Sequence, residues 1–472
     1  MKHNRREFLL RATAAAPFLG ALQSWAAGQH LNVLFMIADD MNNALGCYGH
    51  PVVKTPHLDR LASRSVLFNR AYCQFPLCAP SRASFLSGRR PETTRVLSLT
   101  VPTRKYMQDV VMLPELFRKN GYYSADCGKI YHTGPEHDDP RSWDYVLKES
   151  GKRAPDSEII ARHVAPEPRN HTMEWDKLRT ADENTPDGIV AHTASGLIRQ
   201  SVAKNQPFFM AAGFRRPHAP YAVPQKYFDL YDPQKIERPE IGDQKNIPAA
   251  AWYELANQPE LTPKEYREYI TAYYACNSYV DAQAGVLLKT LDDLNLWDRT
   301  IVVFFGDHGY LTGEHGMWHK MTLFEECARV PLIIHVPGAP GSGKVSNALV
   351  ELLDLYPTLA EACGIPAPPG FEGTSLMSIL KDPSKLGKSA VYTMVGRNDD
   401  RNLSHKKPTY FGKSVRTDRW RYTEWDGGKR GRELYDHHND PKEMRNLASD
   451  PGHNQVVSQL HQLLITQAGH TA

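Results

Sequence analysis

The sequence predicts an α/β fold with a mostly parallel central sheet flanked by helices, and a smaller C-terminal α+β subdomain. Three short runs that are apolar at nearly every position, at 32–38, 208–214 and 301–305, are typical of strands buried on both faces of a parallel sheet. Helical patterns at 186–203 and 263–294 lie between them. With 472 residues, the chain is long enough for one large domain and a smaller one.

The first 27 residues have the features of a signal peptide. Arg5-Arg6-Glu7-Phe8-Leu9 resembles a twin-arginine export motif, the apolar run 12–22 follows it, and Ser24-Trp25-Ala26 offers a cleavage site between small residues. The apolar run is too short to form a stable membrane anchor. An amphipathic N-terminal helix is the alternative. We expect export, and therefore a periplasmic or secreted protein.

Net charge argues against some partners. The whole chain has a formal net charge of +3. Residues 1–27 hold four basic side chains and one acidic side chain, so the remainder of the chain is neutral overall. Binding to nucleic acid through bulk charge is therefore not expected, and an anionic ligand would need local positive charge.

The first apolar strand, 32–38, ends in Asp39 and Asp40. Ligands of open α/β sheets gather at the carboxyl ends of the strands, and two adjacent carboxylates there are costly unless a cation or strong donors compensate them. A solvated acidic turn is the alternative for this pair taken alone. A helical pattern at 55–68 and a short strand at 68–72 come next.

Residues 78–89 have the features of a helix start. Pro80 suits the first helical turn, where a missing N–H costs nothing, and Gly88 is a candidate C-cap. Cys78 then lies just ahead of the helix, where backbone N–H groups favour an anion, and Arg82 adds positive charge one turn later. A buried structural cysteine before an ordinary helix is the alternative.

A helix at 113–119 and a short strand at 122–125 follow, and the strand leads to Lys129 and His132. Polar residues therefore again follow the end of a strand. Residues 133–185 are polar with little periodicity, and we expect a long surface insertion that borders the pocket.

The second apolar strand, 208–214, leads to His218, which lies between two prolines that stiffen its loop. The aromatic residues of the long helix at 263–294 fall on one apolar stripe, so we expect them in the core rather than around a cofactor. The third apolar strand, 301–305, leads to Asp307 and His308.

The character of the sequence changes near residue 385, and we expect the main domain at 28–385 and the C-terminal subdomain at 386–472. The elements expected last in the chain are a strand at 331–336, a helix at 353–363, antiparallel strands at 391–395, 410–415 and 419–424, and a helix at 455–467. The seven cysteines are scattered without a Cys-x-x-Cys pair, which favours buried thiols over a disulfide framework.

The Cys-x-Pro-Ser-Arg sequence at residue 78, with Leu-Ser-Gly-Arg after it, resembles the signature of the type I sulfatases. The other matches occur in family order: Ile37-Ala38-Asp39-Asp40, Gly128-Lys129 with His132, Pro217-His218, Asp307-His308-Gly309, Gly313-Glu314-His315-Gly316 with Lys320, and Ser414-Val415-Arg416-Thr417. Asp-His-Gly is the form found in the iduronate-2-sulfatase-like branch. The resemblance covers nearly the whole chain and implies an alkaline-phosphatase-like central sheet.

The resemblance implies a modified cysteine and a metal. Cys78 would be oxidised to formylglycine by a formylglycine-generating enzyme in the producing cell, and would work as the aldehyde hydrate. Asp39, Asp40, Asp307 and His308 would bind the metal together with residue 78. Oxygen ligands suit Ca²⁺ or Mg²⁺, and the imidazole leaves Mn²⁺ open.

The resemblance also implies roles for the surrounding side chains. Lys129 and Lys320 would bind the sulfate oxygens of the substrate. His218, which would also contact the substrate, would give a proton to the leaving alcohol, and His132 would take one from the hydrate. Arg82 would stabilise the hydrate oxygens.

Four residues near these matches have no implied role. His315, His319 and Arg416 could contact substrate or close a loop, and Trp318 is expected in the core.

The resemblance implies hydrolysis of a sulfuric ester in a sulfated sugar or glycan, one that contains uronate by likeness to the iduronate-2-sulfatase branch. A phosphonate monoester or phosphodiester hydrolase of the same superfamily is the first alternative. A non-catalytic glycan-binding protein on the same scaffold is the second.

Overall fold

The computed structural model describes residues 30–147, 158–164, 173–252, 261–398 and 407–469. The expected signal peptide at 1–27 lies outside the described residues. No helix among those described is both long enough and apolar enough to cross a membrane.

The core of the protein is a nine-stranded, mostly parallel sheet, as predicted. Its strands run in the order β12-β2-β13-β9-β1-β7-β3-β4, and β14 also pairs with β2. The pairs β9–β1, β1–β7 and β7–β3 are parallel, whereas β13 is antiparallel to both of its neighbours. The bounds are β1 (Asn32–Asp39), β2 (Val66–Tyr72), β3 (Tyr123–Gly128), β4 (Tyr145–Leu147), β7 (Phe208–Pro217), β9 (Thr300–Gly306), β12 (Arg329–Val330), β13 (Leu332–His335) and β14 (Lys344–Glu351).

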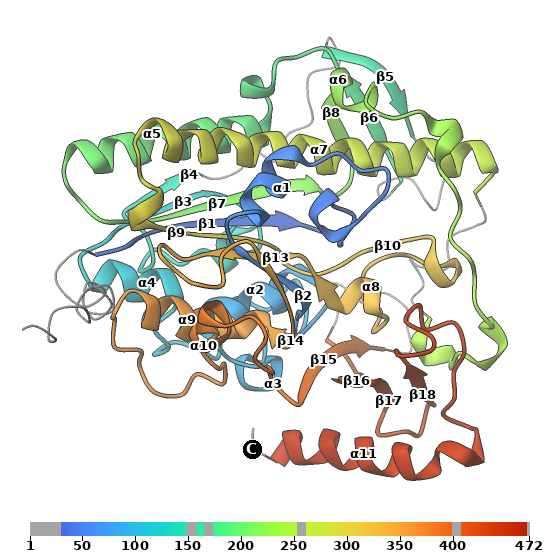
Figure 1. Cartoon of the computed structure of the whole chain (residues 1–472). Helices are drawn as coiled ribbons and strands as arrows, with labels where there is room; N and C mark the ends of the chain where they lie inside the picture. Colours follow the sequence, from blue (N-terminus) through green and yellow to red (C-terminus); the bar gives the residue numbers. More distant parts are fainter. Residues whose placement is uncertain (1–29, 148–157, 165–172, 253–260, 399–406, 470–472) are drawn as a thin grey trace, which may run out of the picture.

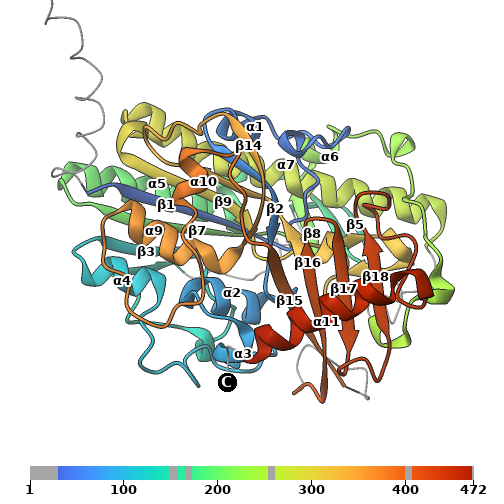
Figure 2. The same ribbon diagram turned by 60° about the horizontal axis from the view of Figure 1, so that its bottom comes forward.

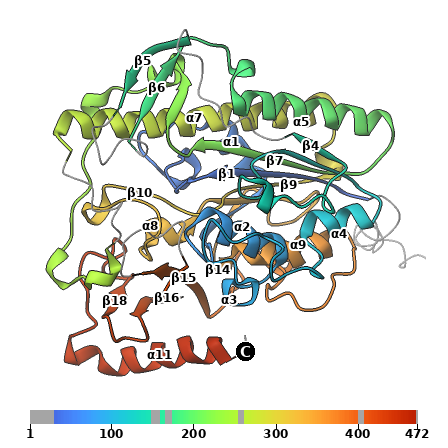
Figure 3. The same cartoon turned by 180° about the vertical axis from the view of Figure 1, so that it is seen from behind.

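Helices cover both faces of this sheet (Figure 1). One face carries α5 and α7, with α1 beside them, and the other carries α2, α4 and α9. The bounds are α1 (Pro56–Ala62), α2 (Cys78–Ser87), α3 (Pro91–Thr94), α4 (Leu113–Lys119), α5 (Pro186–Ala203), α6 (Gln225–Phe228), α7 (Pro263–Asp293), α8 (Glu325–Ala328), α9 (Leu355–Ala362) and α10 (Met377–Lys381). Figure 3 shows the same three layers from behind.

Strand β1 shows why its sequence is apolar from Val33 to Ala38. Leu34 and Met36 pack into the core on the α5 and α7 side, and Val33 and Phe35 pack into the core on the α2 and α4 side. Because successive side chains of a strand point to opposite faces, a strand covered on both faces needs apolar residues at every position.

The C-terminal subdomain is a four-stranded antiparallel sheet, and α11 lies across it (Figure 2). The bounds are β15 (Ala390–Arg397), β16 (Tyr410–Thr417), β17 (Trp420–Trp425), β18 (Arg432–Asp436) and α11 (Asn454–Gly469). Three of these strands and the helix were predicted, but β18 was not. The extent of the subdomain from residue 386 stays a prediction.

Several expected boundaries and segments were wrong. The helix expected at 55–68 ends at Ala62, and β2 begins at Val66, before the expected start. Strand β14 was not predicted at all. Segment 133–185 contributes β4 to the central sheet and two strands to a small sheet, and its expected position beside the pocket stays a prediction. The remaining strands form two small sheets: β5 (Ile159–His163), β6 (Trp175–Leu178) and β8 (Tyr221–Pro224) in one, and β10 (Leu311–Thr312) and β11 (Trp318–His319) in the other.

All seven cysteines carry free thiols, and five of them are buried. The prediction of scattered buried thiols is therefore confirmed for those five.

Candidate active site

Four neighbouring parallel strands place the predicted side chains at one edge of the sheet. Asp39 ends β1, Lys129 follows β3, His218 follows β7, and Asp307 follows β9. Since β9, β1, β7 and β3 are adjacent and parallel, their carboxyl ends meet. Helix α2 begins at the same place with Cys78 as its first residue, rather than one position before it as expected.

Cys78 is buried and lies among charged groups. Its Sγ is 3.2 Å from Lys320 Nζ and 3.9 Å from Lys129 Nζ. His308 Nε2 lies 3.4 Å from the same sulfur, and Asp40 Oδ1 lies 4.0 Å from it. A substituent on the Cβ of residue 78 is therefore in reach of two ammonium groups, an imidazole and a carboxylate.

The four predicted ligand positions around Cys78 converge. Donor atoms of Asp39, Cys78, Asp307 and His308 all lie within 4.8 Å of one another, as do those of Asp39, Asp40, Cys78 and His218. Three buried carboxylates in one place need compensating positive charge. Asp39 is paired with Lys129, and Asp40 Oδ1 lies 2.6 Å from Lys320 Nζ. This set of oxygen donors fits a hard divalent cation.

The hydrogen bonds of two histidines fix which ring nitrogen is free. His308 Nδ1 lies 2.9 Å from the carbonyl of Gly309, and His218 Nδ1 lies 2.6 Å from the carbonyl of Ala219. A carbonyl only accepts, so each Nδ1 carries a hydrogen, and Nε2 holds the lone pair when the ring is neutral. Nε2 of His308 is therefore the nitrogen that would bind a cation, in place of a proton, and Nε2 of His218 is able to exchange a proton.

The charges of the site perturb its pKa values. Burial favours a neutral Asp39, but Lys129, His218 and Arg82 outweigh it and hold the pKa of Asp39 well below its usual value. Burial would likewise lower the pKa of His308, yet the carboxylate of Asp307 raises it to about 9.

His218 and His132 both carry lowered pKa values. Burial lowers the pKa of His218 to about 3, against the effect of Asp40. Burial, followed by the positive charge of Lys129, lowers the pKa of His132 to about 2. Nδ1 of His132 is buried and has no hydrogen-bond partner within the described residues. In this state both rings are neutral near pH 7.

The side chain of Arg82 binds protein acceptors rather than the space around Cys78. Its Nε lies 2.9 Å from Asp307 Oδ2 and its Nη2 lies 3.2 Å from Asp39 Oδ1. Its Nη1 donates to the carbonyls of Lys129 and Ile130. The guanidinium thereby joins the ends of β1, β3 and β9, and its expected role toward the oxygens of residue 78 stays a prediction.

Sequence reasoning missed two residues that position the site. The hydroxyl of Ser81 donates to the carbonyl of Asp307 and so ties α2 to the end of β9. The hydroxyl of Tyr273 donates to the carbonyl of Asp40 at 2.9 Å. Tyr273 belongs to the predicted apolar stripe of α7, and no sequence signal separates its hydroxyl from those of the neighbouring core tyrosines.

All four residues without an implied role are buried. Trp318 packs in the core against Tyr266 and Tyr269, as predicted. His319 Nδ1 lies 2.6 Å from the hydroxyl of Tyr310. His315 stacks on Phe324, and Arg416 donates to the carbonyl of Asp418 at 3.1 Å.

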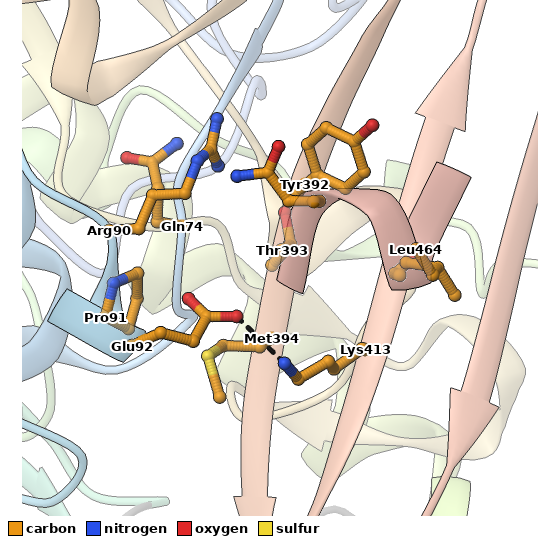
Figure 4. Close-up of a pocket in the computed structure, with 11 residues that line it drawn as sticks. Gln74, Arg90, Pro91, Glu92, Tyr392, Thr393, Met394, Lys413 and Leu464 are labelled. Carbon is orange, nitrogen blue, oxygen red and sulfur yellow. Dashed lines mark hydrogen bonds and ion pairs between the residues drawn. The ribbon is translucent and has the colours of Figure 1, made fainter. Parts of the chain in front are cut away.

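A separate pocket lies between α3 and the C-terminal sheet (Figure 4). An ion pair between Lys413 Nζ and Glu92 Oε1, 3.1 Å apart, crosses it, and Arg90 and Met394 line it. Its cavity of about 20 Å³ holds about one water molecule. This pocket is too small for a sugar, and none of the predicted site residues lines it.

Comparison with known proteins identifies the group to which this arrangement belongs. The sulfatase family model matches residues 31–365. The chain belongs to the sulfatase family. A second model, the C-terminal part of N-sulphoglucosamine sulphohydrolase, matches residues 313–469. The family resemblance drawn from the motifs is confirmed, and this sulfatase is a sulfuric ester hydrolase.

Curated relatives align with most of this sulfatase. The iduronate 2-sulfatase of Homo sapiens is 33% identical, with 84% of this chain and 85% of that protein covered. The iduronate 2-sulfatase of Mus musculus is 31% identical and covers 94% of this chain and 96% of its own length. A sulfatase of Formosa agariphila is 31% identical, over 89% of this chain and 83% of that protein.

Solved structures share the fold. The complex of BT4656 with its substrate D-glucosamine-2-N,6-O-disulfate superposes with a TM-score of 0.80 at 21% identity, over 94% of this chain and 98% of that one. BT1596, a 2-O GAG sulfatase, superposes with a TM-score of 0.75 at 26% identity, over 94% of this chain and 93% of that one. The phosphonate monoester hydrolase of Agrobacterium radiobacter superposes with a TM-score of 0.78 at 22% identity, over 94% of this chain and 96% of that one. The alkaline-phosphatase-like sulfatase fold was therefore predicted correctly.

Proposed function

We propose that this sulfatase removes sulfate from a sulfated, uronate-containing sugar or glycan, with residue 78 in the formylglycine form and Ca²⁺ as the cation. The observation that carries the proposal is the convergence of Cys78, the three carboxylates and the two lysines in one buried site. The names of the relatives support the substrate class, since the human relative is iduronate 2-sulfatase and BT1596 is a 2-O GAG sulfatase.

The proposal assigns the attacking oxygen to residue 78. The formylglycine hydrate would supply a hydroxyl nucleophile, and the cation would neutralise the sulfate and favour the ionised hydroxyl. The donors of Asp39, Asp40, Asp307 and His308 would hold that cation beside residue 78. Lys129 and Lys320, now paired with carboxylates, would turn their charge toward the sulfate oxygens.

The histidines would move the protons. His218 would first take a proton at Nε2 when the anionic sulfate ester binds beside it, and would then give that proton to the leaving alcohol, while its Nδ1–H stays on the carbonyl of Ala219. His132 would act as the base that lets the hydrate collapse and release sulfate, and its lowered pKa leaves the ring unprotonated before that step. Arg82 would be a positioning residue that holds Asp39 and Asp307.

A phosphonate monoester or phosphodiester hydrolase is the second candidate. The phosphonate monoester hydrolase of Agrobacterium radiobacter superposes well on this chain, but at 22% identity that likeness supports the fold alone. The identity of 33% to iduronate 2-sulfatase over most of the chain favours the sulfate ester.

The test combines a mass measurement with three substrates. Protein made together with a formylglycine-generating enzyme should yield a peptide spanning residue 78 that is lighter than the thiol form by about 18 Da. We expect this protein to release sulfate from 4-nitrophenyl sulfate and from an oligosaccharide that ends in a sulfated uronate. The variant Cys78→Ala should be inactive on both.

The outcomes separate the candidates. Faster turnover of a phosphodiester than of either sulfate ester would favour the second candidate. An unmodified cysteine, with glycan binding but no turnover, would favour a non-catalytic protein.

Two further proposals concern the whole chain. We propose that residues 1–27 direct export through the twin-arginine route to the periplasm or outside the cell. The substrate partner would then be an extracellular or periplasmic sulfated carbohydrate, with the formylglycine-generating enzyme acting on Cys78 before export.

A further inference from the structure

We propose that His315, Glu326 and Glu443 bind a second divalent cation, Zn²⁺, at a site separate from the one around Cys78. One donor atom from each side chain lies within 4.8 Å of the other two. The three residues come from three segments: the short 3₁₀ helix η10 (Glu314–Gly316), helix α8, and the loop after β18. The cation would therefore join the C-terminal subdomain to the main domain.

The imidazole of His315 is buried without a hydrogen bond. The residue is 1% exposed, and neither ring nitrogen has a hydrogen-bond partner in the described part of the chain. Its ring stacks on Phe324 with the centroids 3.9 Å apart, so its orientation is fixed. A buried polar group without a partner is costly, and each such case in a folded protein needs an explanation. A bound cation would satisfy one nitrogen.

The spacing between His315 and Glu326 suits two ligands of one ion. His315 Nε2 lies 3.7 Å from Glu326 Oε2, which is too long for a hydrogen bond. That oxygen is also buried and has no hydrogen-bond partner among the described residues. Two atoms each about 2.1 Å from a tetrahedral zinc ion lie about 3.4 Å from each other. A small closure of this pair would reach that separation.

Glu443 supplies the third donor from a fixed position. Its Oε1 accepts from Arg421 Nε and lies 2.8 Å from His437 Nε2. Its Oε2 accepts one hydrogen bond, from the backbone N–H of Glu325 at 2.8 Å, and keeps a second lone pair. Ligand carboxylates in metal sites are held in this way by outer hydrogen bonds.

The donor set favours zinc over calcium. One imidazole and two carboxylates are common zinc ligands, whereas calcium prefers oxygen atoms alone. With three protein ligands, a water molecule would complete the tetrahedron. The charges of Zn²⁺ and of the two carboxylates sum to zero. Arg421, which contacts Glu443, is also paired with Glu325, so the interior would keep only a small net charge.

The proposed zinc site lies between the loop that carries Lys320 and the C-terminal subdomain. His315 lies in the loop that also carries Lys320, and α8 directly precedes β12 of the central sheet. A cation there would hold this loop against the C-terminal subdomain, and binding to the folded state alone would raise thermal stability.

The experiment counts bound metal with Zn²⁺ as the only probe. Purified full-length protein is treated with a chelator, loaded with Zn²⁺, separated from free ion and analysed for zinc per chain. We expect two equivalents for the unchanged protein and one for His315→Gln. Asp307→Asn, which alters the site around Cys78, should also hold one, and the double variant none.

The four proteins keep the two sites distinguishable. If the site around Cys78 binds no zinc but the His315 site does, Asp307→Asn will hold as much zinc as the unchanged protein. His315→Gln will still lose one equivalent. The inference is overturned if His315→Gln and Glu326→Gln both hold as much zinc as the unchanged protein. In that case His315 and Glu326 form an ion pair only.

A matched histidine controls for the loss of a buried ring. Both ring nitrogens of His335 face backbone carbonyls, at 2.8 Å and 3.3 Å. His335→Gln should therefore keep the full zinc content. Zinc should also raise the melting temperature of Asp307→Asn and His335→Gln but not that of the double variant, as followed by circular dichroism.

Discussion

Arg82 holds the candidate site together through a fork of donors that lysine cannot replace. It reaches Asp307 and Asp39 at 2.9 and 3.2 Å, and it also donates to two backbone carbonyls. All three side chains are almost fully buried. A planar guanidinium can bridge several acceptors at once, whereas an ammonium group acts as one point charge.

We therefore expect Arg82→Lys to lower kcat by about 100-fold or more, since small displacements of reacting groups cost that much. The free energy of unfolding should fall by about 3–5 kcal/mol, because buried carboxylates lose their partner. Steady-state kinetics with 4-nitrophenyl sulfate and denaturant unfolding measure the two effects.

Arg90→Lys is the matched control for that variant. Arg90 is buried and binds both oxygens of Glu351, at 2.8 and 2.7 Å, but it lies away from Cys78. Its substitution should lower stability with little change in kcat of the folded protein. Equal losses of kcat in both variants would contradict the positioning role of Arg82.

The sequence predicted which side chains lie close together when those side chains directly follow strands of the parallel sheet. Asp39, Lys129, His218 and Asp307 follow the carboxyl ends of parallel strands, so their convergence was predictable. The partner of Arg82 was not, because the direction of a long side chain depends on acceptors from distant segments.

Among the elements, β3 and β7 leave no room for a side chain at Gly213, where they carry the site. A Cβ added at Gly213 would lie 2.2 Å from the backbone carbonyl oxygen of Lys129. Gly213→Ala should therefore push the two strands apart, lower stability, and reduce activity through displacement of Lys129. Thermal unfolding and kinetics together measure this outcome.

Gly196→Ala is the control, because nothing lies within 4 Å of a Cβ at this position in α5. Alanine favours a helix over glycine by up to about 1 kcal/mol, so this variant should be slightly more stable and fully active. A fully active, stable Gly213→Ala would show that the strand ends tolerate the displacement.

The end of β14 carries a buried ion network that predicts acid sensitivity. Glu351 binds Arg90 and lies 2.6 Å from Lys388 Nζ, and it accepts from the N–H of Tyr392 in β15. Burial opposes ionisation, but Arg90 and Lys388 outweigh it and lower the pKa of Glu351 to about 2.

A carboxyl group with a lowered folded-state pKa stabilises the protein above its unfolded pKa, and this stabilisation is lost as the pH falls through the folded value. We expect the free energy of unfolding to fall by roughly 3 kcal/mol between about pH 4.5 and 2 through Glu351 alone. Burial raises the pKa of neighbouring Asp354, which offsets part of this effect.

Denaturant titrations at several pH values check this dependence. Glu351→Gln should be less stable near neutral pH and should show a flatter pH dependence below pH 4.5. Asp229→Asn, at an exposed position, should follow the unchanged protein. An unaltered slope in Glu351→Gln would contradict the assignment.

Element prediction from sequence was accurate for buried, periodic segments. Helices α4 and α5 have the predicted bounds, and α7 ends one residue before the predicted end. Strands β14 and β18 were missed, because both mix charged and apolar residues without the continuous apolar pattern of a central strand.

At the scale of the whole molecule, one hydrophobic cluster spans the main domain and the C-terminal subdomain. Trp425 of β17 is fully buried there and packs with Leu77, the residue before Cys78, and with Phe324. The guanidinium of Arg397 lies over the Trp425 ring and donates to the carbonyl of Met321 at 2.7 Å. The two parts should therefore unfold together.

We expect Trp425→Ala to lower the free energy of unfolding by about 3–5 kcal/mol, because it empties a large buried volume. It also removes the indole N–H that Glu433 accepts at 2.7 Å. On heating, activity and the circular dichroism signal should be lost in one transition at a lower temperature. Trp420→Ala, at a partly buried position, should have a smaller effect.

Separate transitions for activity and for the antiparallel sheet would contradict this coupling. The same result would also argue that residues 386–472 form an independent folding unit.

The sequence by itself determined the parallel sheet, most of its helices and the family, because continuous apolar runs and ordered motifs are local properties of the chain. Tertiary structure alone decided that β13 runs antiparallel, that Arg82 joins three strand ends, and that Tyr273 supports Asp40. It also brought His315, Glu326 and Glu443 together. Periodicity reports whether a segment is buried, but the partners of a buried polar group depend on packing between segments far apart in the chain.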